Sequence, residues 1–385
     1  MEEKFKCPIC GNQDPKYFGR RNGKIYCRKC ISFKGETVLN RDHYPKASPI
    51  TISYSLSNEQ ITISDKLVSN YKNGINSLVN AVCGAGKTEI VLKVISYALQ
   101  CGDKVGFTIP RRDVAIELFE RFKNFFRSNK VVAVYGGHHE ELDGDLIILT
   151  THQLYRYNNF FDLLIIDEID AFPYQNNEVL NTFFYKSLRG NYIMMSATPS
   201  EEILKEFNQN GFEILSLNNR FHGYPLPRPE VFVAYKPLLN FLLIRFLFLF
   251  KRQKKQVFIF CPTIEMCESV YSFLRPIFKN GNFVHSKREN RSEIINSFRN
   301  KKIMFLVTTA VLERGVTVSD LQVIVYLANH HIYDYHSLIQ ISGRVGRKMN
   351  APEGRVIFLS EEDTDDIKKC VEQIEIANKD LQGMF

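Results

Sequence analysis

Residues 81–88 read Ala-Val-Cys-Gly-Ala-Gly-Lys-Thr and follow an apolar run that begins at Ser77. Glycines in such a loop let backbone N–H groups come close to phosphate oxygens. A lysine at its end supplies a positive charge for the β- and γ-phosphates, and a threonine supplies a hydroxyl for Mg²⁺. We therefore predict that Lys87 and Thr88 bind the phosphates of ATP and its magnesium. The rest of the phosphate cradle is predicted to be Gly84, Ala85 and Gly86.

A second decisive run lies far along the chain, where residues 340–347 read Gln-Ile-Ser-Gly-Arg-Val-Gly-Arg. Arg344 and Arg347 are three positions apart, so on a helix they would share one face. Such a pair can act as arginine fingers on the γ-phosphate, and Gln340 begins the same segment. The two runs together predict two lobes with a nucleotide held between them.

Apolar runs alternate with helical patterns after residue 49, as in parallel strands connected by helices. The predicted strands are 77–82, 105–109, 146–149, 163–166 and 192–195, then 256–260, 303–307, 322–327 and 355–359. A segment rich in turn-forming residues, 218–229, separates the two series. The sequence therefore predicts an α/β fold with two RecA-like lobes and parallel sheets. Their predicted bounds are 49–225 and 226–385, after a small module at 1–48.

Acidic and hydroxyl side chains follow two of these strands, at the sheet edge where parallel sheets bind ligands. Asp167 and Glu168 come directly after the run 163–166, and we predict that Asp167 holds Mg²⁺ while Glu168 activates water. Ser196 and Thr198 follow the run 192–195 and are predicted to couple hydrolysis to lobe movement. The alternative for this Ser-Ala-Thr segment is a helix cap or a turn before Pro199.

Four of the nine cysteines form two Cys-x-x-Cys pairs near the N-terminus: Cys7, Cys10, Cys27 and Cys30. This spacing is typical of zinc ribbons, in which each pair presents two thiolates from a tight turn. A module of about 40 residues buries too little surface to fold alone, so a metal would supply the missing stability. We predict one Zn²⁺ at these cysteines, with a redox-active dithiol as the alternative.

The 385 residues carry a net charge of +8, which favours a polyanionic partner. The N-terminus has no apolar signal-peptide core. The most apolar stretch, 238–250, is interrupted by Asn240 and Arg245 and is shorter than the roughly 20 residues that span a bilayer. It is interpreted as a helix packed on the second lobe, with a membrane-surface anchor as the alternative. We expect a cytoplasmic protein without a transmembrane segment.

Between about residues 54 and 360 the chain resembles superfamily 2 helicases and translocases, whose short motifs occur here in the family order. This resemblance implies that Gln60 contacts adenine, with Tyr54 as a stacking partner. It implies further nucleotide contacts at Gly315 and Asp320. The nucleic-acid contacts that it implies are Pro110, Arg111, Thr151, His152, Thr263 and Thr308.

The four-cysteine module directly before the motor narrows the resemblance to the ComFA family, the ATPase of DNA uptake in naturally competent Gram-positive bacteria. Membership implies an ATP-driven translocase on single-stranded DNA that works with the uptake channel and other competence proteins. It also allows a peripheral position at the inner face of the cell membrane. Two alternatives remain open: a replication-restart helicase like PriA, and a nucleotide-controlled clamp without processive movement.

Between Cys7 and Cys30 the module carries six basic residues: Lys16, Arg20, Arg21, Lys24, Arg28 and Lys29. These side chains are interpreted either as a DNA contact or as a solvated surface on a structural zinc module. A DNA contact there would involve phosphates and would be sensitive to salt.

Overall fold

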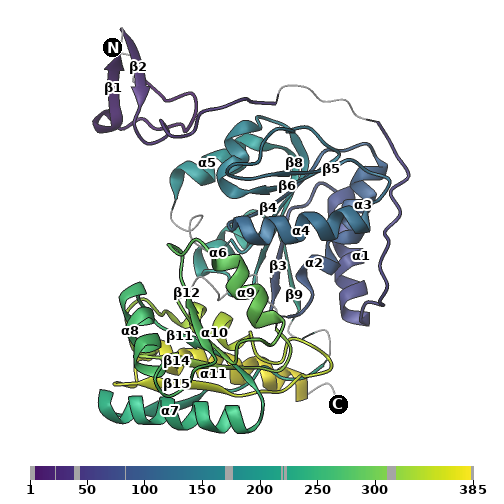
Figure 1. Ribbon diagram of the computed structural model, residues 1–385. Coiled ribbons are helices and arrows are strands. Elements are labelled where there is room, and N and C mark those ends of the chain that lie inside the picture. The colour runs from purple at the N-terminus through teal and green to yellow at the C-terminus, as the bar shows by residue number, and fades with distance from the viewer. Residues whose placement is uncertain are drawn as a thin grey trace. The chain divides into compact units, whose positions relative to one another are not determined.

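The protein is described from a computed structural model (Figure 1). The residues that it describes are 5–21, 23–38, 44–82, 84–169, 177–217, 220, 223–309 and 318–382. The chain divides into two compact units. The first consists of residues 1–81 and 86–217, and the second of residues 82–85 and 218–385.

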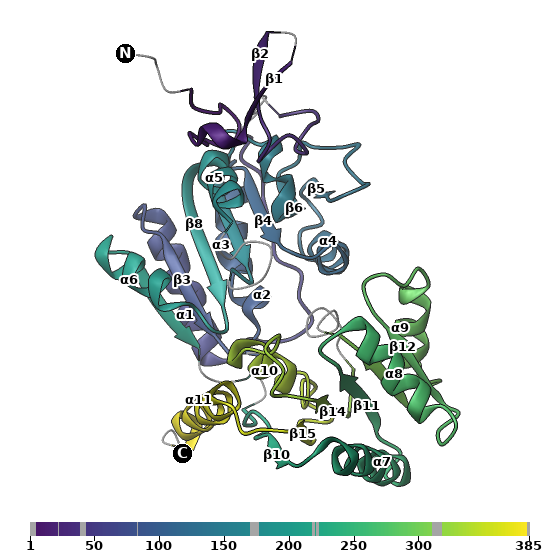
Figure 2. The same ribbon diagram turned by 90° about the vertical axis from the view of Figure 1, so that its left-hand side faces the viewer.

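The N-terminal cysteine module is a small part of the first unit. Its regular elements are a short 3-10 helix, η1 (Pro15–Tyr17), and the strands β1 (Phe18–Arg21) and β2 (Lys24–Cys27). The two strands pair antiparallel, with Phe18 opposite Cys27. This hairpin is visible at the N-terminal end of the chain in Figure 2.

The first unit contains a seven-stranded sheet in the order β5-β6-β4-β7-β8-β3-β9. Every pairing in it is parallel. Its strands are β3 (Ser77–Ala81), β4 (Val105–Ile109), β5 (Val131–Val134), β6 (Leu146–Thr150), β7 (Phe161–Asp167), β8 (Leu188–Ser196) and β9 (Glu213–Leu217). The central strands are apolar along their length because helices cover both faces of the sheet.

Successive side chains of these strands point to opposite faces of the sheet. Ile147, Leu149 and Leu164 share one buried cluster with side chains of η2 (Thr151–Arg156), α5 (Glu178–Ser187) and α6 (Glu201–Gln209). Phe107 contacts Phe122 of α4, with ring centroids 5.2 Å apart. The other helices of this unit are α1 (Asn58–Lys72), α2 (Lys87–Ile90), α3 (Leu92–Gln100) and α4 (Arg112–Phe125).

The second unit contains a six-stranded sheet in the order β10-β15-β14-β11-β13-β12, and again every pairing is parallel. Its strands are β10 (Glu230–Val233), β11 (Gln256–Phe260), β12 (Gly281–Val284), β13 (Phe305–Thr308), β14 (Leu321–Tyr326) and β15 (Val356–Ser360). Its helices are α7 (Lys236–Arg252), α8 (Ile264–Leu274), α9 (Arg291–Arg299), α10 (Tyr335–Ser342) and α11 (Asp365–Gln382). One face of this sheet packs on α7 and α8, and the other on α9, α10 and α11.

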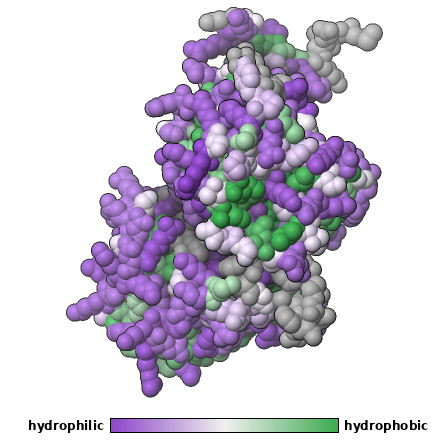
Figure 3. Space-filling view, turned by 90° about the vertical axis from the view of Figure 1, so that its right-hand side faces the viewer, coloured by the Kyte–Doolittle hydropathy of each residue, from purple (hydrophilic) through white to green (hydrophobic). Residues whose placement is uncertain are grey.

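Helix α7 is the apolar stretch that the sequence singled out. Its residues Leu239, Leu243 and Leu247 are completely buried against β11, β14 and β15, which confirms a helix packed on the second lobe. Its outer side carries Phe241 and Phe248, both more than half exposed. Among the described residues, no helix has the length and apolarity needed to cross a bilayer. The face drawn in Figure 3 is largely hydrophilic, with hydrophobic residues gathered in a smaller area.

The predicted fold class is confirmed: two parallel α/β lobes with the structure of RecA-like domains, preceded by a four-cysteine module. All nine predicted strands are present. The edge strands β5, β9, β10 and β12 were not predicted. β9, β10 and β12 are partly exposed and contain polar residues, so they lack the continuous apolar run of a central strand. β5 reads Val-Val-Ala-Val and is largely buried, so the sequence reasoning missed it in spite of its apolar run.

Candidate ATP, nucleic-acid and zinc sites

The phosphate loop lies between β3 and α2. Gly86 caps α2 in a left-handed conformation with φ +84°, and Gly84 has φ +86°. A Cβ on Gly86 would lie 2.4 Å from Nε2 of Gln60, so both the backbone angle and the available space require glycine. Lys87 and Thr88 are the first two residues of α2 and are half-buried. Ala85 is fully buried and its N–H bonds the carbonyl oxygen of Val82.

Gln60 lies beside this loop because a capping box fixes it at the start of α1. Its Oε1 accepts a 2.9 Å hydrogen bond from the N–H of Ser57, and its own N–H bonds the hydroxyl of Ser57. Tyr54 donates to Glu89 of α2, which also pairs with Arg121 at 2.6 Å. Burial is the largest cause of a raised pKa at Tyr54, so its hydroxyl stays protonated. The structure thus brings the predicted adenine-contact residues next to the helix that carries Lys87.

The acidic and hydroxyl residues lie at the carboxyl ends of neighbouring strands in the same sheet. Asp167 ends β7 opposite Met195 of β8, and Ser196 ends β8 opposite Asn80 of β3. Asp167 is 8% exposed and accepts a 2.9 Å hydrogen bond from the N–H of Glu168. Because β3 runs directly into the phosphate loop, this pairing places the acids, Ser196 and the loop along one sheet edge.

Glu168 has a φ of +58°, a backbone angle that residues other than glycine seldom adopt. Such strain persists only where the surroundings hold it, and it concentrates at functional sites. Ser196 accepts a 2.9 Å hydrogen bond from the N–H of Thr198, so the Ser-Ala-Thr segment forms the turn that was the alternative interpretation. Ser196 is thus held at the edge with Asp167, and Thr198 follows it in the turn. Asp170, the last residue of the acidic box, lies outside the described residues.

The predicted nucleic-acid segments of the first unit follow β4 and β6. Pro110 is buried and Arg111 caps α4, while Thr151 and His152 begin η2. Thr151 is completely buried, and its hydroxyl lies 3.5 Å from that of Thr108 at the end of β4. Burial lowers the pKa of His152, which favours the neutral imidazole. These segments are held together by contacts within the unit.

In the second unit, Thr263 follows β11, and Thr308 is the last residue of β13. Thr263 caps α8 by accepting a 3.2 Å hydrogen bond from the N–H of Met266. Thr308 is fully buried and its hydroxyl bonds the carbonyl oxygen of Thr309. Gly315 lies outside the described residues.

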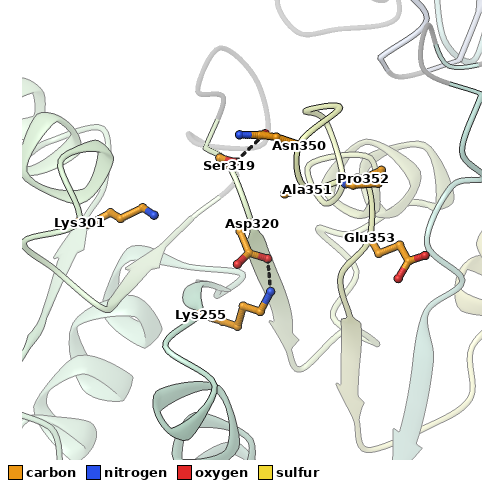
Figure 4. Close-up of a pocket in the computed structure, with 8 residues that line it drawn as sticks. All are labelled: Lys255, Lys301, Ser319, Asp320, Asn350, Ala351, Pro352 and Glu353. Carbon is orange, nitrogen blue, oxygen red and sulfur yellow. Dashed lines mark hydrogen bonds and ion pairs between the residues drawn. The ribbon is translucent and has the colours of Figure 1, made fainter.

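Asp320 lies at the amino end of β14, where its carboxylate bonds the ammonium group of Lys255 at the start of β11 (Figure 4). Ser319 and Asn350 hydrogen-bond nearby at 3.2 Å. These residues, with Glu353 before β15, line a polar cavity of about 350 Å³. This cavity opens at the edge formed by the amino ends of the strands, whereas Thr308 lies at a carboxyl end. The structure therefore separates Asp320 from the other edge residues of this sheet.

The segment 340–347, which carries Arg344 and Arg347, differs from the sequence prediction in one respect. Helix α10 ends at Ser342, so Arg344 and Arg347 lie beyond it and do not share a helical face. The chain turns because Gly346 adopts φ +67°, and a Cβ there would lie 2.0 Å from the carbonyl oxygen of Pro352. Gln340 remains on α10 and is buried. Arg344 is 2% exposed, and Nε of Arg347 donates a 2.8 Å hydrogen bond to Gly343.

Arg220 is a residue that sequence reasoning missed and that contacts the segment 340–347. Its side chain is 1% exposed and donates hydrogen bonds to the carbonyl oxygens of Val345, at 2.7 Å, and Gly343. A buried arginine bonded to the turn fixes the backbone that carries Arg344 and Arg347. Nothing in its local sequence distinguishes it from a surface arginine, because its partners are more than a hundred positions away.

The four predicted zinc ligands converge in the N-terminal module. All four are at least 95% buried, and their sulfur atoms lie within 4.8 Å of one another. The Sγ atoms of Cys7 and Cys30 are 3.6 Å apart, and those of Cys10 and Cys27 are 3.7 Å apart. Tetrahedral zinc with Zn–S bonds of about 2.3 Å requires sulfur atoms about 3.8 Å apart, so the donor set fits this metal.

The protonation of the Cys30 thiol also depends on a metal. Burial and the neighbouring thiols raise the pKa of Cys30, so without a cation this thiol keeps its proton. A bound dication would favour the thiolate, because cysteine coordinates metals in its deprotonated form. Asn12 bonds the sulfur of Cys27 at 3.6 Å and supports the cluster from outside.

Two family models match the chain. Residues 53–201 match the type III restriction enzyme res subunit, and residues 238–349 match the helicase conserved C-terminal domain. The chain is 34% identical to the competence protein ComFA of Streptococcus pneumoniae, over 98% of this chain and 91% of that protein. It is 32% identical to ComFA of Bacillus subtilis, over 93% of this chain and 82% of that protein.

Two weaker similarities are informative in other ways. The structure of Saccharomyces cerevisiae Dbp5 bound to RNA and ADP BeF3 matches with a TM-score of 0.64 at 15% identity, covering 84% of this chain and 92% of that chain. This match supports the fold alone. The replication restart protein PriA of Borreliella burgdorferi is 24% identical over only 43% of this chain and 28% of that protein.

Proposed function

Because the chain belongs to the ComFA family, we propose that it is an ATP-driven motor that moves along single-stranded DNA during competence. The chain is a superfamily 2 ATPase of the helicase type. The competence role is inferred from the names of its relatives. The movement on single-stranded DNA is inferred from the resemblance of its motifs.

One observation carries the ATPase part of the proposal. The phosphate loop, Asp167, Glu168 and Ser196 gather at the carboxyl edge of three adjacent strands, β3, β8 and β7. Lys87 would bind the β- and γ-phosphates as a point charge. Glu168 would position and deprotonate the attacking water.

Magnesium fits this edge as well. The hydroxyl of Thr88 and the carboxylate of Asp167 are hard oxygen donors, the type that Mg²⁺ prefers. Mg²⁺ would neutralise charge on the β- and γ-phosphates. We further propose that Arg344 and Arg347 stabilise the charge on the transferred phosphate, from the turn that Arg220 holds.

The two alternatives are less well supported. A PriA-like restart helicase matches less than half of this chain. The position of Glu168, in a rare backbone conformation next to Asp167, favours hydrolysis and so argues against a clamp that binds ATP without hydrolysing it.

The proposal is tested by measuring ATP hydrolysis with single-stranded DNA, duplex DNA and RNA in parallel, at one salt concentration. We expect the strongest stimulation by single-stranded DNA, and faster displacement of a protein block from a labelled DNA end when ATP is present. Hydrolysis that responds equally to all three nucleic acids, or a block that stays in place, would contradict the motor. The uptake role is tested by transformation frequency in cells carrying Lys87→Ala, which should fall to the level of a deletion.

A further inference from the structure

Among the contacts that join the cysteine module to the helicase lobe, the aromatic side chain of Phe33 packs directly on η2. This residue follows the last cysteine closely, and its N–H bonds the carbonyl oxygen of Cys30 at 3.0 Å. Its ring packs against three residues of η2 and α5. It stacks on His152 with an interplanar angle of 16° and a centroid distance of 6.3 Å. It also contacts Tyr155, at 5.6 Å, and Phe183, at 4.9 Å.

Hydrogen bonds to the chain just after Phe33 fix the same contact. The hydroxyl of Tyr155 donates to the carbonyl oxygen of Lys34 at 2.8 Å, and Nη1 of Arg156 donates to that of Glu36 at 2.9 Å. The N–H of Val38 bonds the carbonyl oxygen of Arg156 at 2.9 Å. Three alternate residues of the module's C-terminal arm, Lys34, Glu36 and Val38, are therefore bonded to η2 through their backbone.

The first cysteine pair is held on the same side of the lobe. Lys186 of α5 bonds the carbonyl oxygens of Pro8 and Ile9, between Cys7 and Cys10. The four cysteines belong to the same buried cluster as Leu154 of η2 and Phe183 of α5. The core of the module and the core of the lobe are thus continuous, as expected for a fixed attachment and not for a tethered domain.

Helix η2 is also the segment that carries the predicted nucleic-acid contacts Thr151 and His152. Thr151 in turn touches Thr108, the last residue but one of β4, and Pro110 and Arg111 follow that strand. The cysteine cluster, Phe33, η2 and the end of β4 therefore form one unbroken series of packed side chains within the first unit.

We propose that the zinc module positions the DNA-contacting segment of the first lobe, and that Phe33 is the side chain through which it does so. Metal held by the four thiolates would fix the turn at Cys30, and the turn fixes Phe33 against His152. Losing either the metal or the ring would loosen η2 and weaken binding of single-stranded DNA. The DNA part of this inference rests on the proposed function.

The test is Phe33→Ala in the full-length protein, with Tyr26→Ala as the control. Tyr26 belongs to the same module, but its ring covers Gly19 on the neighbouring strand of the hairpin. Three quantities are measured: zinc per chain, hydrogen exchange of residues 151–156, and the Kd for a single-stranded oligonucleotide. We expect Phe33→Ala to keep its zinc, to exchange faster in η2, and to bind DNA about 3- to 30-fold more weakly. Tyr26→Ala should match the wild type, and Phe33→Tyr should restore most of the affinity.

A double variant separates positioning from independent damage. If the metal acts through Phe33, Cys30→Ser combined with Phe33→Ala should weaken DNA binding no more than the stronger single change. The inference would be overturned if the losses of DNA affinity in the two single variants multiply in the double variant. It would also be overturned if Phe33→Ala keeps its zinc and shows unchanged hydrogen exchange in η2 and an unchanged Kd. A wild-type protein that binds no single-stranded DNA would instead refute the proposed function, whereas an unaffected Phe33→Ala variant of a DNA-binding wild type refutes only the positioning role.

Discussion

Replacing Gly86 by alanine tests whether the phosphate loop depends on its glycine for the reasons seen in the structure. Two costs are expected. A non-glycine residue in the left-handed region costs roughly 1–2 kcal/mol. The new Cβ would also lie 2.4 Å from Nε2 of Gln60, whose Oε1 is held by the N–H of Ser57. Moving Gln60 away breaks the capping box, which costs about 1 kcal/mol more.

Gly74→Ala is the matched control for this prediction. Gly74 has φ +71° in the same unit, but nothing lies within 4 Å of the position of its Cβ. It should therefore show only the backbone cost. We expect Gly86→Ala to lower the free energy of unfolding of the first unit by about 2–3 kcal/mol and Gly74→Ala by about 1–2 kcal/mol.

Chemical denaturation of the two variants measures the loss of stability, and nucleotide titration measures their affinity for ATP. Gly86→Ala should also raise the Kd for ATP about tenfold or more, because its Cβ intrudes where backbone N–H groups must approach the phosphates. Gly74→Ala should leave the Kd unchanged. The reasoning is refuted if the two variants lose the same stability and both bind ATP normally.

The remaining predictions concern hydrolysis and the metal. Glu168→Gln should keep ATP binding but lower kcat at least about 100-fold, measured by steady-state hydrolysis and nucleotide titration, and near-normal turnover would remove its role as base. Arg344→Ala and Arg347→Ala should each slow hydrolysis at least about 100-fold with a smaller change in ATP affinity. A large loss of affinity at unchanged kcat would argue against a transition-state role. Cys30→Ser should release the zinc, as metal analysis would show. Zinc affinity of the wild type should fall as the pH is lowered, since the raised pKa of Cys30 makes its thiolate harder to form; a pH-independent affinity would contradict thiolate ligation.

Local chemistry made much of the site predictable. The glycines, Lys87 and Thr88 adjoin one another in sequence because the predicted phosphate contacts belong to one loop, and the predicted magnesium ligand Asp167 is the last residue of its own strand. The cysteine pairs lie two by two in short turns, so their spacing alone indicated a tetrahedral site. These features depend on neighbours within a few residues, which is the range over which sequence patterns carry information.

Other features could not be predicted because they depend on distant partners. The prediction that a helix carries both Arg344 and Arg347 was wrong because the chain turns at Gly346, which lies close to the backbone of Pro352. This contact exists only in the folded chain. The edge strands β9, β10 and β12 pair with a neighbouring strand although their own sequences lack a continuous apolar run. In the sequence Arg220 cannot be distinguished from a surface arginine; only the folded structure shows its hydrogen bond to Val345.

The sequence by itself determined the fold class, the glycine-rich loop between β3 and α2 and the cluster of four cysteines, since each is specified by residue types at short, fixed spacings. Only the tertiary structure decided that Asp167, Ser196 and the phosphate loop share one edge, because strand order sets which ends are neighbours. It alone joined Phe33 to His152, more than a hundred residues apart in the chain, through the shape and packing of two apolar surfaces. Long-range packing of this kind leaves no regular pattern in a single sequence, because many different residue pairs can fill the same space.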